Sequence, residues 1–234
     1  MGQKKLLRFN AIASFPNVLQ YPEGMAGNWK DFFHNENPIT LELACGKGEY
    51  SVNLGREHRD RNFIGVDLKG NRMYIGAKQA LDESLPNVAF LRTQILRITD
   101  YFREGEIDTI WIIFPDPFLR ESKAKKRLTH PRFLRLYQQI LKPGGLIQLK
   151  TDSEELYKFT LEVIREQGCT LHENISDVYG QGKDTGALAI RTHYENMHLA
   201  EGRTIRLLSF SLPPEEIKLP EKKSIEEETD LKSE

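Results

Sequence analysis

Long hydrophobic runs are absent from this sequence of 234 residues. No apolar stretch approaches the roughly 20 residues that a membrane-spanning helix needs, and the first residues, MGQKKLLRFN, lack the apolar core of a secretory signal. Cysteine is scarce: Cys45 and Cys169 are far apart and form no CxxC pair, so neither a disulfide framework nor a zinc site is indicated. The six histidines are scattered, with no metal-binding pair one helical turn apart. These absences predict a soluble protein of the reducing cytoplasm that binds neither membrane nor metal.

The net charge of −1 is the sum of two segments of opposite sign. Residues 213–234 hold eight acids and four bases, so subtracting their −4 from −1 leaves a body of +3. This acidic tail is nearly free of aromatics and is expected to be disordered. Within the body, RESKAKKRLTHPRFLR (120–135) holds seven Lys or Arg and one Glu, a density suited to attracting a polyanion. A solvated surface loop stays the alternative for this stretch.

Short apolar or β-branched runs alternate with stretches of helical spacing along residues 31–212. Five of these runs are expected to be strands: ITLELAC (39–45), FIGVDLK (63–69), VAFLRTQ (88–94), TIWIIFP (109–115) and GLIQLKT (145–151). Two weaker candidates, TLHENISDVY and RTIRLLSF, follow at 170–179 and 203–210. This order predicts one α/β domain with a doubly wound, mostly parallel, seven-stranded sheet and helices on both faces. Residues 1–30 contain several Pro and Gly with little periodicity and are expected to form an N-terminal arm or extension.

A glycine loop follows the first expected strand in LELACGKGEY (41–50). Gly46 and Gly48 would let a ligand approach the backbone beyond the carboxyl end of that strand. Asp67, nineteen residues after Gly48, could accept hydrogen bonds from the ribose hydroxyls of NAD or S-adenosylmethionine, or cap the next helix. Glu42 favours the cationic S-adenosylmethionine, because a pyrophosphate would be repelled, although pairing with a buried Lys or Arg is the alternative. Ser51 also replaces the third glycine of GxGxxG, which disfavours a dinucleotide.

Two further candidates lie at the ends of the third and fourth expected strands. Gln94 stands where an adenine edge would lie, and its amide could donate and accept, although a polar strand end is an equal reading. FPDPF (114–118) places Asp116 between two prolines that fix their own backbone angles. Such pre-set geometry suits a transfer reaction, and a simple turn is the alternative. The basic stretch begins directly afterwards, at Arg120, so a carboxylate and a polyanion-binding surface would be adjacent.

Taken together, these motifs resemble the bacterial tRNA (guanine-N7)-methyltransferase family over roughly residues 35–210. The likeness rests on LELACGKGEY, GVDLK, FPDPF with the Lys/Arg-rich stretch, LKTD ending at Asp152, and the run THYE (192–195). The chain departs from the family at three positions: Gln94 replaces Asn or Asp, Phe118 replaces Trp, and Arg120 replaces Lys. Each departure keeps the hydrogen-bonding, stacking or charge character of the position.

The resemblance implies a Rossmann-like methyltransferase that uses S-adenosylmethionine, releases S-adenosyl-L-homocysteine and methylates N7 of a variable-loop guanine in tRNA. It implies that the cofactor or reaction centre is contacted by Glu42, Asp67, Gln94 and Asp116. It also implies that the target nucleotide is faced by Arg120, Asp152, Thr192, His193, Tyr194 and Glu195.

Guanine N7 already carries a lone pair, so the expected chemistry is mainly alignment of the base with the methyl group. Asp116 is the catalytic candidate, because a carboxylate would stabilise the positive charge that develops on the purine, while Asp152 or Glu195 would grip the donor edge of guanine. The RNA backbone would be positioned by cations of the basic stretch: Lys123, Lys125, Lys126, Arg127, Arg132 and Arg135. A monomer or homodimer is expected. The competing functions are an NAD-dependent oxidoreductase and a non-catalytic tRNA-binding module on the same fold.

Overall fold

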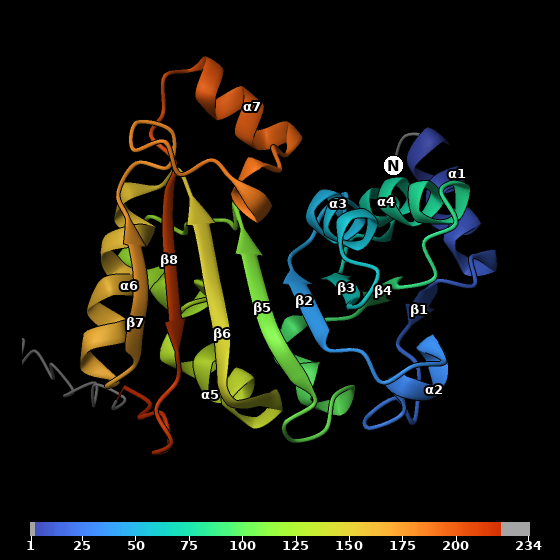
Figure 1. Ribbon diagram of the computed structural model, residues 1–234, viewed down its shortest axis with the longest axis horizontal. Coiled ribbons are helices and arrows are strands. Elements are labelled where there is room, and N and C mark those ends of the chain that lie inside the picture. Colours follow the sequence, from blue (N-terminus) through green and yellow to red (C-terminus); the bar gives the residue numbers. More distant parts are fainter. Residues whose placement is uncertain (1–2, 221–234) are drawn as a thin grey trace, which may run out of the picture.

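The protein is built around one central sheet of eight strands, in the order β1-β4-β3-β2-β5-β6-β8-β7 (Figure 1). The computed structural model describes residues 3–220. The strands are β1 (Val18–Gln20), β2 (Ile39–Leu43), β3 (Asn62–Asp67), β4 (Val88–Arg92), β5 (Ile107–Ile113), β6 (Leu141–Thr151), β7 (Thr170–Ile175) and β8 (Arg206–Ser211). Only β8 among them runs against its neighbours, β6 and β7. The doubly wound, mostly parallel α/β architecture predicted from the sequence is confirmed.

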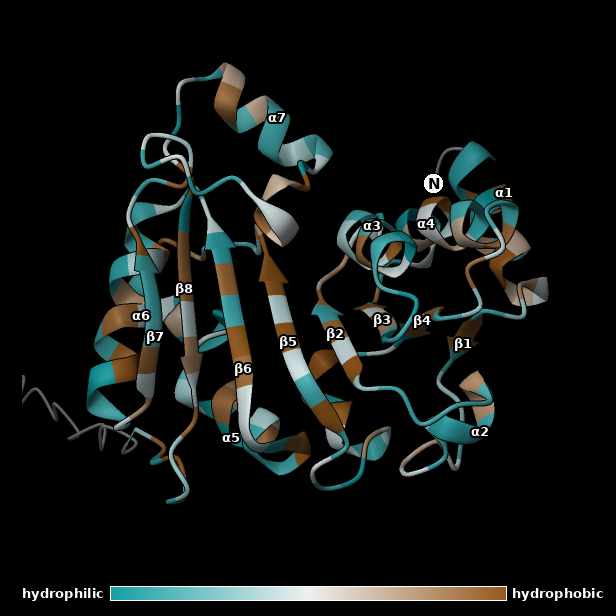
Figure 2. Cartoon of the chain, in the orientation of Figure 1, coloured by the Kyte–Doolittle hydropathy of each residue, from teal (hydrophilic) through white to brown (hydrophobic). Residues whose placement is uncertain are grey.

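Helices cover both faces of the sheet. They are α1 (Gln3–Ala11), α2 (Trp29–Phe33), α3 (Glu49–Glu57), α4 (Gly70–Asp82), α5 (Pro131–Ile140), α6 (Glu154–Glu166) and α7 (His193–Ala200). Successive strand residues alternate between two cores: in β5, Ile110 and Ile112 pack with α2, α5 and α6, whereas Trp111 and Ile113 pack with α3 and α4. The central strands are therefore apolar over most of their length (Figure 2), as expected of a parallel sheet covered on both sides.

The expected count of seven strands is wrong, because the segment 1–30 supplies an additional one. Its strand β1 pairs in parallel with β4, with Val18 opposite Phe90. Trp29 of the same segment is fully buried, donates a hydrogen bond from Nε1 to the Tyr101 carbonyl (2.8 Å) and stacks on Phe102. A strand of three residues is too short for a periodic pattern to show, which is why the sequence indicated only an arm or extension.

The first part of the acidic tail is docked on the domain rather than disordered. The Gln138 side-chain amide of α5 donates to the carbonyls of Pro213 (2.8 Å) and Glu215 (2.7 Å) and accepts from the backbone N–H of Ile217 (3.1 Å). Ile217 is itself buried in the core beside α5 and α6. The remainder of the tail, 221–234, lies outside the described residues.

Candidate active site

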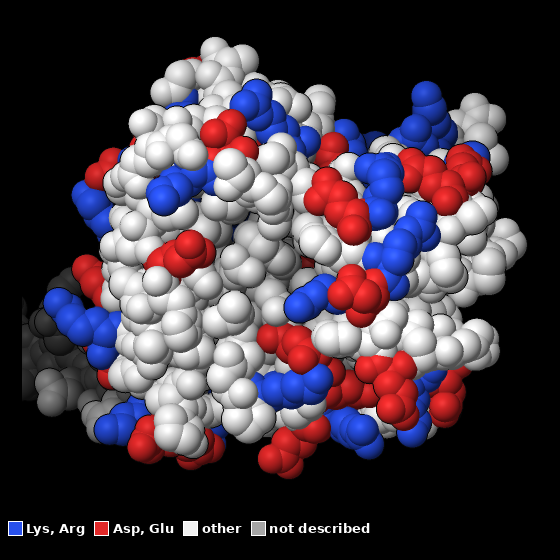
Figure 3. All heavy atoms as spheres, viewed as in Figure 1, with Lys and Arg blue, Asp and Glu red and all other residues white. Residues whose placement is uncertain are grey.

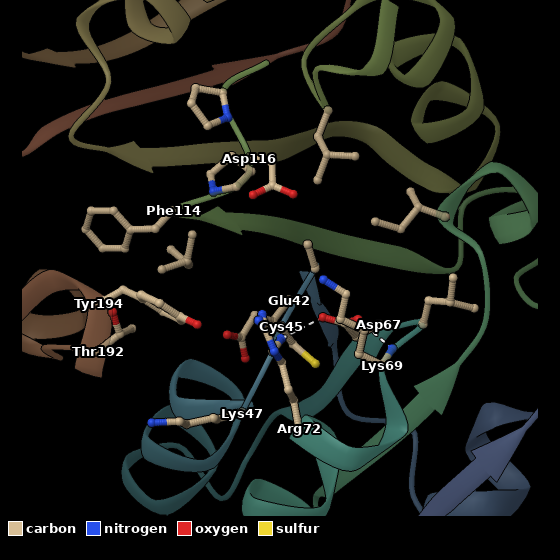
Figure 4. A pocket seen from close by; sticks show the side chains of 18 of the residues that line it. Glu42, Cys45, Lys47, Asp67, Lys69, Arg72, Phe114, Asp116, Thr192 and Tyr194 are labelled. Carbon is tan, nitrogen blue, oxygen red and sulfur yellow. Dashed lines mark hydrogen bonds between the residues drawn. The ribbon is translucent and has the colours of Figure 1, made fainter. Parts of the chain in front are cut away.

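A cavity of about 690 Å³ lies at the carboxyl ends of β2 to β6 (Figure 4). The sheet order reverses here: from β2 the chain proceeds to β3 and β4 on one side and to β5 and β6 on the other. In doubly wound sheets such a switch point leaves a crevice in which ligands bind. The start of α7 forms a further part of the wall, since Thr192 and Tyr194 also line the cavity.

The glycine loop between β2 and α3 is held open by the carboxylate of Asp67. Its Oδ2 accepts the backbone N–H of Gly46 (2.9 Å) and its Oδ1 accepts that of Lys69 (2.8 Å). Gly48 has φ +70°, and a Cβ there would lie 2.3 Å from the Phe90 ring, so only glycine fits. Gly46, at φ +56°, has open space where a Cβ would be. Asp67 thus lines the cavity and fixes the loop beside it, and its bond to Lys69, the residue before α4, lies where the alternative role as a helix cap was expected.

Glu42 is a buried carboxylate on the wall of the cavity. Its Oε2 accepts hydrogen bonds from the backbone N–H (2.8 Å) and the hydroxyl (2.7 Å) of Ser51, rather than pairing with a Lys or Arg. Burial raises the pKa of Glu42 to about 7, although the Ser51 hydrogen bonds act in the opposite direction. A carboxylate that is so poorly solvated favours a cationic ligand, which the sulfonium and ammonium groups of S-adenosylmethionine provide.

The end of β4 offers polar groups to a nucleoside. Gln94 lines the cavity as predicted, with its side chain exposed. The preceding Thr93 is fully buried, lines the same cavity, and its hydroxyl has no hydrogen-bond partner in the described part of the chain. An orphaned buried hydroxyl is uncommon, and one on a residue that lines a cavity fits a ligand group that completes its hydrogen bonding. With Asp67 and Glu42, these residues fit the adenosine and sulfonium of S-adenosylmethionine.

The loop after β5 holds Asp116 in a strained backbone. Asp116 lines the cavity with its carboxylate exposed to it (Figure 4). Phe114 (φ +44°) and Phe118 (φ +43°) flank the Pro-Asp-Pro run in the left-handed region, which bulky residues rarely adopt. Each such position costs about 1–3 kcal/mol and persists only where the surroundings enforce it. The buried guanidinium of Arg127 does so, donating to the carbonyls of Pro117 and Phe118, both at 3.2 Å.

Asp152, which the resemblance places toward the target nucleotide, lines the cavity just after β6. Its Oδ2 accepts a hydrogen bond from Arg203 (2.8 Å) and lies 3.7 Å from Nδ1 of His198. Arg120 and His193 are not among the residues that line the cavity. The backbone N–H of His193 instead donates to the Glu49 carboxylate (3.1 Å), which ties α7 to α3.

Glu195 does not reach the cavity either. Its carboxylate lies in the interior, 2.6 Å from Nζ of Lys150, and accepts a hydrogen bond from the Tyr179 hydroxyl (2.7 Å). Both side chains of the ion pair are fully buried. The expectation that Glu195 faces the target nucleotide therefore does not fit this placement, since its hydrogen-bonding capacity is taken up inside the protein.

Some cations of the basic stretch are exposed to solvent, and others contact groups within the protein. Lys123, Lys125 and Lys126 are exposed on a short 3-10 helix (Glu121–Lys126), and Lys126 lines the cavity. Arg127 is buried and braces the Asp116 loop. Arg135 pairs with Glu216 of the docked tail segment, and Arg132 is half-buried over the Phe133 ring. The exposed cations of the stretch that have the accessibility for backbone contact are therefore Arg120 and the three lysines.

Several lining residues were not identified from the sequence. They are Lys47, Lys69, Arg72, Thr93, His198 and Arg203. Thr93 directly precedes Gln94, so the strand-end argument that selected Gln94 could have included it. Lys47 and Lys69 lie within the motifs LELACGKGEY and GVDLK, so those motifs could have identified them. Arg72, His198 and Arg203 reach the cavity through tertiary packing, which no local pattern encodes.

A glycine loop at the switch point, a carboxylate at the end of β3 and a buried acid facing a nucleoside-sized cavity define a methyltransferase of the doubly wound α/β class. A family described as a putative methyltransferase matches residues 36–208. A tRNA (guanine-N(7)-)-methyltransferase of Porphyromonas gingivalis is 47% identical over 213 residues, covering 86% of each chain. One from Bacteroides fragilis is 44% identical over 224 residues, covering 92% of this chain and 88% of the relative. The chain belongs to the tRNA (guanine-N(7)-)-methyltransferase family.

Solved structures support the fold. The 16S rRNA methyltransferase KamB superposes with a TM-score of 0.62 at 15% identity, covering 80% of this chain and 94% of KamB. A 16S rRNA (adenine(1408)-N(1))-methyltransferase from Catenulisporales acidiphilia gives 0.57 at 14% identity, covering 81% and 94%. At such identities the likeness concerns the fold alone. Within residues 3–220, no helix is both long and apolar enough to cross a membrane.

Proposed function

We propose that the protein transfers the methyl group of S-adenosylmethionine to N7 of a guanine in tRNA. The observation that carries this proposal is the position of Asp116. A strained loop, braced by Arg127, holds it at the cavity between the glycine loop and the exposed Lys123, Lys125 and Lys126. The names of the relatives, at 44–47% identity over most of the chain, support the substrate. Neither competing function receives such support, and the buried Glu42 disfavours the pyrophosphate of NAD.

Different residues of the cavity would bind different parts of the cofactor. Asp67 offers acceptor oxygens to the ribose hydroxyls, and Thr93 and Gln94 offer hydrogen bonds to the adenine edge. Glu42 supplies negative charge to the cationic end of the ligand. When bound, S-adenosylmethionine supplies an electrophilic methyl group on its sulfonium.

On the acceptor side no base has to remove a proton, because guanine N7 already has a lone pair. The protein therefore has to orient the purine and stabilise the positive charge that the purine gains. Asp116 is placed for the second task. Asp152, whose carboxylate Arg203 holds in place, can accept hydrogen bonds from the donor edge of guanine. The exposed lysines would contact phosphates while the acids read a base taken out of its stack.

Labelled methyl transfer tests the proposal. Unmodified tRNA transcripts are incubated with tritiated S-adenosylmethionine and the protein, and then treated with borohydride and aniline, which cleave the strand at N7-methylguanine. We expect incorporation and cleavage at one guanine, and neither in a transcript that has adenine at that position. Incorporation without cleavage would assign the methyl group to another atom, and no incorporation would reject the proposal.

Two further expectations stay predictions beside it: the reaction takes place in the cytoplasm, and the enzyme is a monomer or a homodimer. The two cysteines, Cys45 and Cys169, are free, which suits a reducing compartment.

A further inference from the structure

The exposed Lys123, Lys125 and Lys126 lie on the β5 side of the cavity. The rim is also cationic at the glycine loop, where Lys47 lines the cavity, and between β3 and α4, where Lys69 and Arg72 line it. Within residues 3–220, none of these three side chains takes part in an ion pair. Their charge is therefore available to an anion that approaches the cavity.

Helix α1 extends this cationic rim away from the cavity. Its sequence, QKKLLRFNA, has three basic residues and no acid. Lys4 and Lys5 are exposed, Arg8 is half-exposed over the Tyr74 ring, and none of the three forms an ion pair within the described residues. Figure 3 shows Lys and Arg side chains at the upper right of the molecule, where Figure 1 places α1. None of these cations stabilises the fold through an acidic partner.

Apolar and cation–π contacts fix α1 directly beside the cavity rim. Phe9 packs under the Arg92 guanidinium, 4.7 Å from the ring centre. Ile12 and Phe9 approach Gly70 so closely that a Cβ there would lie 2.5 Å and 3.3 Å from them. Gly70 is the first residue of α4 and follows Lys69, which lines the cavity. Helix α1 thus packs against the start of α4, next to Lys69 and Arg72 of the rim.

We propose that α1, together with Lys69 and Arg72, forms a second RNA-backbone surface, which binds tRNA phosphates remote from the target guanine. This inference rests on the proposed function and deepens it: the RNA would be held on both sides of the cavity. A folded RNA is rigid and presents phosphates in many directions, so separated cationic surfaces can contact it at once. The structure also supplies a reason for two surfaces, since Arg127 and Arg135 of the first are engaged within the protein.

An anionic membrane is the other polyanion that a basic amphipathic helix could meet, since Leu6 and Leu7 are 51% and 65% exposed. The placement favours RNA. Helix α1 packs against the start of α4, next to Lys69 and Arg72 of the concave cavity, and a bound polynucleotide could contact both, whereas a flat bilayer could not follow the concave rim.

The test compares two variants that each lose three positive charges. One combines Lys4→Gln, Lys5→Gln and Arg8→Gln. The matched control combines Lys30→Gln in α2 with Arg59→Gln and Arg61→Gln just before β3, and none of these residues lines the cavity. The dissociation constant for unmodified tRNA is measured by filter binding over a range of salt concentrations, without cofactor. Methyl transfer and thermal melting are measured separately.

For the α1 variant we expect the Kd for tRNA at ~0.15 M salt to rise at least about tenfold, and the slope of log Kd against log salt to fall by about two to three. The control should keep the wild-type Kd and slope, and both variants should keep the wild-type melting temperature. An α1 variant with the Kd and slope of the wild type would overturn the inference. So would loss of binding to phosphatidylglycerol vesicles with unchanged tRNA binding. Failure of the wild type to methylate tRNA would instead reject the proposed function, since binding is scored independently.

Discussion

The ammonium group of Lys150 lies 2.6 Å from the carboxylate of Glu195, and neither side chain is exposed to solvent. Lys150 also donates to the Tyr50 hydroxyl (3.1 Å) and to the carbonyls of Leu188 (3.1 Å) and Ile190 (3.2 Å). One ammonium group therefore joins β6, the helix after the glycine loop, and the segment that leads into α7. The pair thereby fixes the start of α7, whose Thr192 and Tyr194 line the cavity.

Replacing Lys150 with Met should lower the free energy of unfolding by about 3–5 kcal/mol, because Glu195 would stay buried without its cation. Adding Glu195→Gln to that variant should restore part of the loss, since the buried charge is then removed. Urea denaturation measures both. A double variant that is less stable than the single variant by the full effect of a separate Glu195→Gln change would show that the two side chains do not act as a pair.

The buried Glu42 should make stability depend on pH. Its pKa is about 7 in the folded protein and 4.5 ordinarily, so the unfolded chain releases its proton first as the pH rises. The contribution of Glu42 to the free energy of unfolding is therefore fully present below pH 4.5, and it falls by about 3 kcal/mol in total as the pH rises to about 7. Relative to Glu42→Gln, the wild type should lose this amount between pH 4.5 and 7.5. Urea unfolding at several pH values measures it, with the exposed Glu57→Gln as control. A constant difference between wild type and Glu42→Gln would contradict the buried-acid interpretation.

Substituting Asp116 with Asn should lower the rate of methyl transfer about 100-fold or more, because the amide keeps the shape but cannot balance the charge that the purine gains. Binding of tRNA and of S-adenosylmethionine should change little. Single-turnover kinetics with saturating tRNA separates the chemical step from binding. Turnover near the wild-type rate would remove Asp116 from the mechanism.

Replacing each of the two loop glycines, Gly46 and Gly48, with alanine should affect stability and cofactor affinity to different extents. In Gly48→Ala the new Cβ meets the Phe90 ring, so the protein should lose at least about 2 kcal/mol of stability. In Gly46→Ala the Cβ has nothing within 4 Å, but the positive φ of +56° still strains an alanine by about 1–2 kcal/mol, so the loss of stability should be smaller than in Gly48→Ala and should be accompanied by a loss of affinity for S-adenosylmethionine. Denaturation and calorimetric titration of both variants distinguish these results. Equal losses of stability would show that Gly46 serves the loop backbone alone.

Arg127→Lys should act on stability and not on the salt dependence of tRNA binding. The lysine cannot reproduce the guanidinium fork that serves the carbonyls of Pro117 and Phe118, which leaves a buried carbonyl without a donor at a cost of about 1–3 kcal/mol. The exposed Lys125→Gln should do the reverse, with normal stability and a salt slope reduced by about one. If Arg127→Lys flattened the salt slope as well, the side chain would have to reach RNA.

The strands and the glycine loop could be predicted from the sequence because each leaves a local signal. Strands covered on both faces are apolar at almost every position, and the pattern located all of them except β1. Gly46, Gly48 and Asp67 were identified because a turn with positive φ and a carboxylate at a strand end are each encoded by a few neighbouring residues.

The orientation of charged side chains could not be predicted in the same way. Glu195 and Arg127 lie in segments that line the cavity, but one points into an ion pair with Lys150 and the other under the Asp116 loop. Which face of a segment is buried depends on what packs against it, and here the partners come from β6 and from the loop after β5. The same limit applies to Thr93 and His198, which tertiary packing brings to the cavity.

The place of β8 has a consequence for synthesis of the protein on the ribosome. This strand lies between β6 and β7 but follows both in the chain. Until residue 211 has been translated, β6 presents an open edge, and Arg203 has not completed its contact with Asp152 on the nucleotide side of the cavity. A nascent chain stalled before this point would expose unpaired strand edges that invite aggregation. The cavity can therefore assemble only after translation has passed β8, even though the glycine loop is made far earlier.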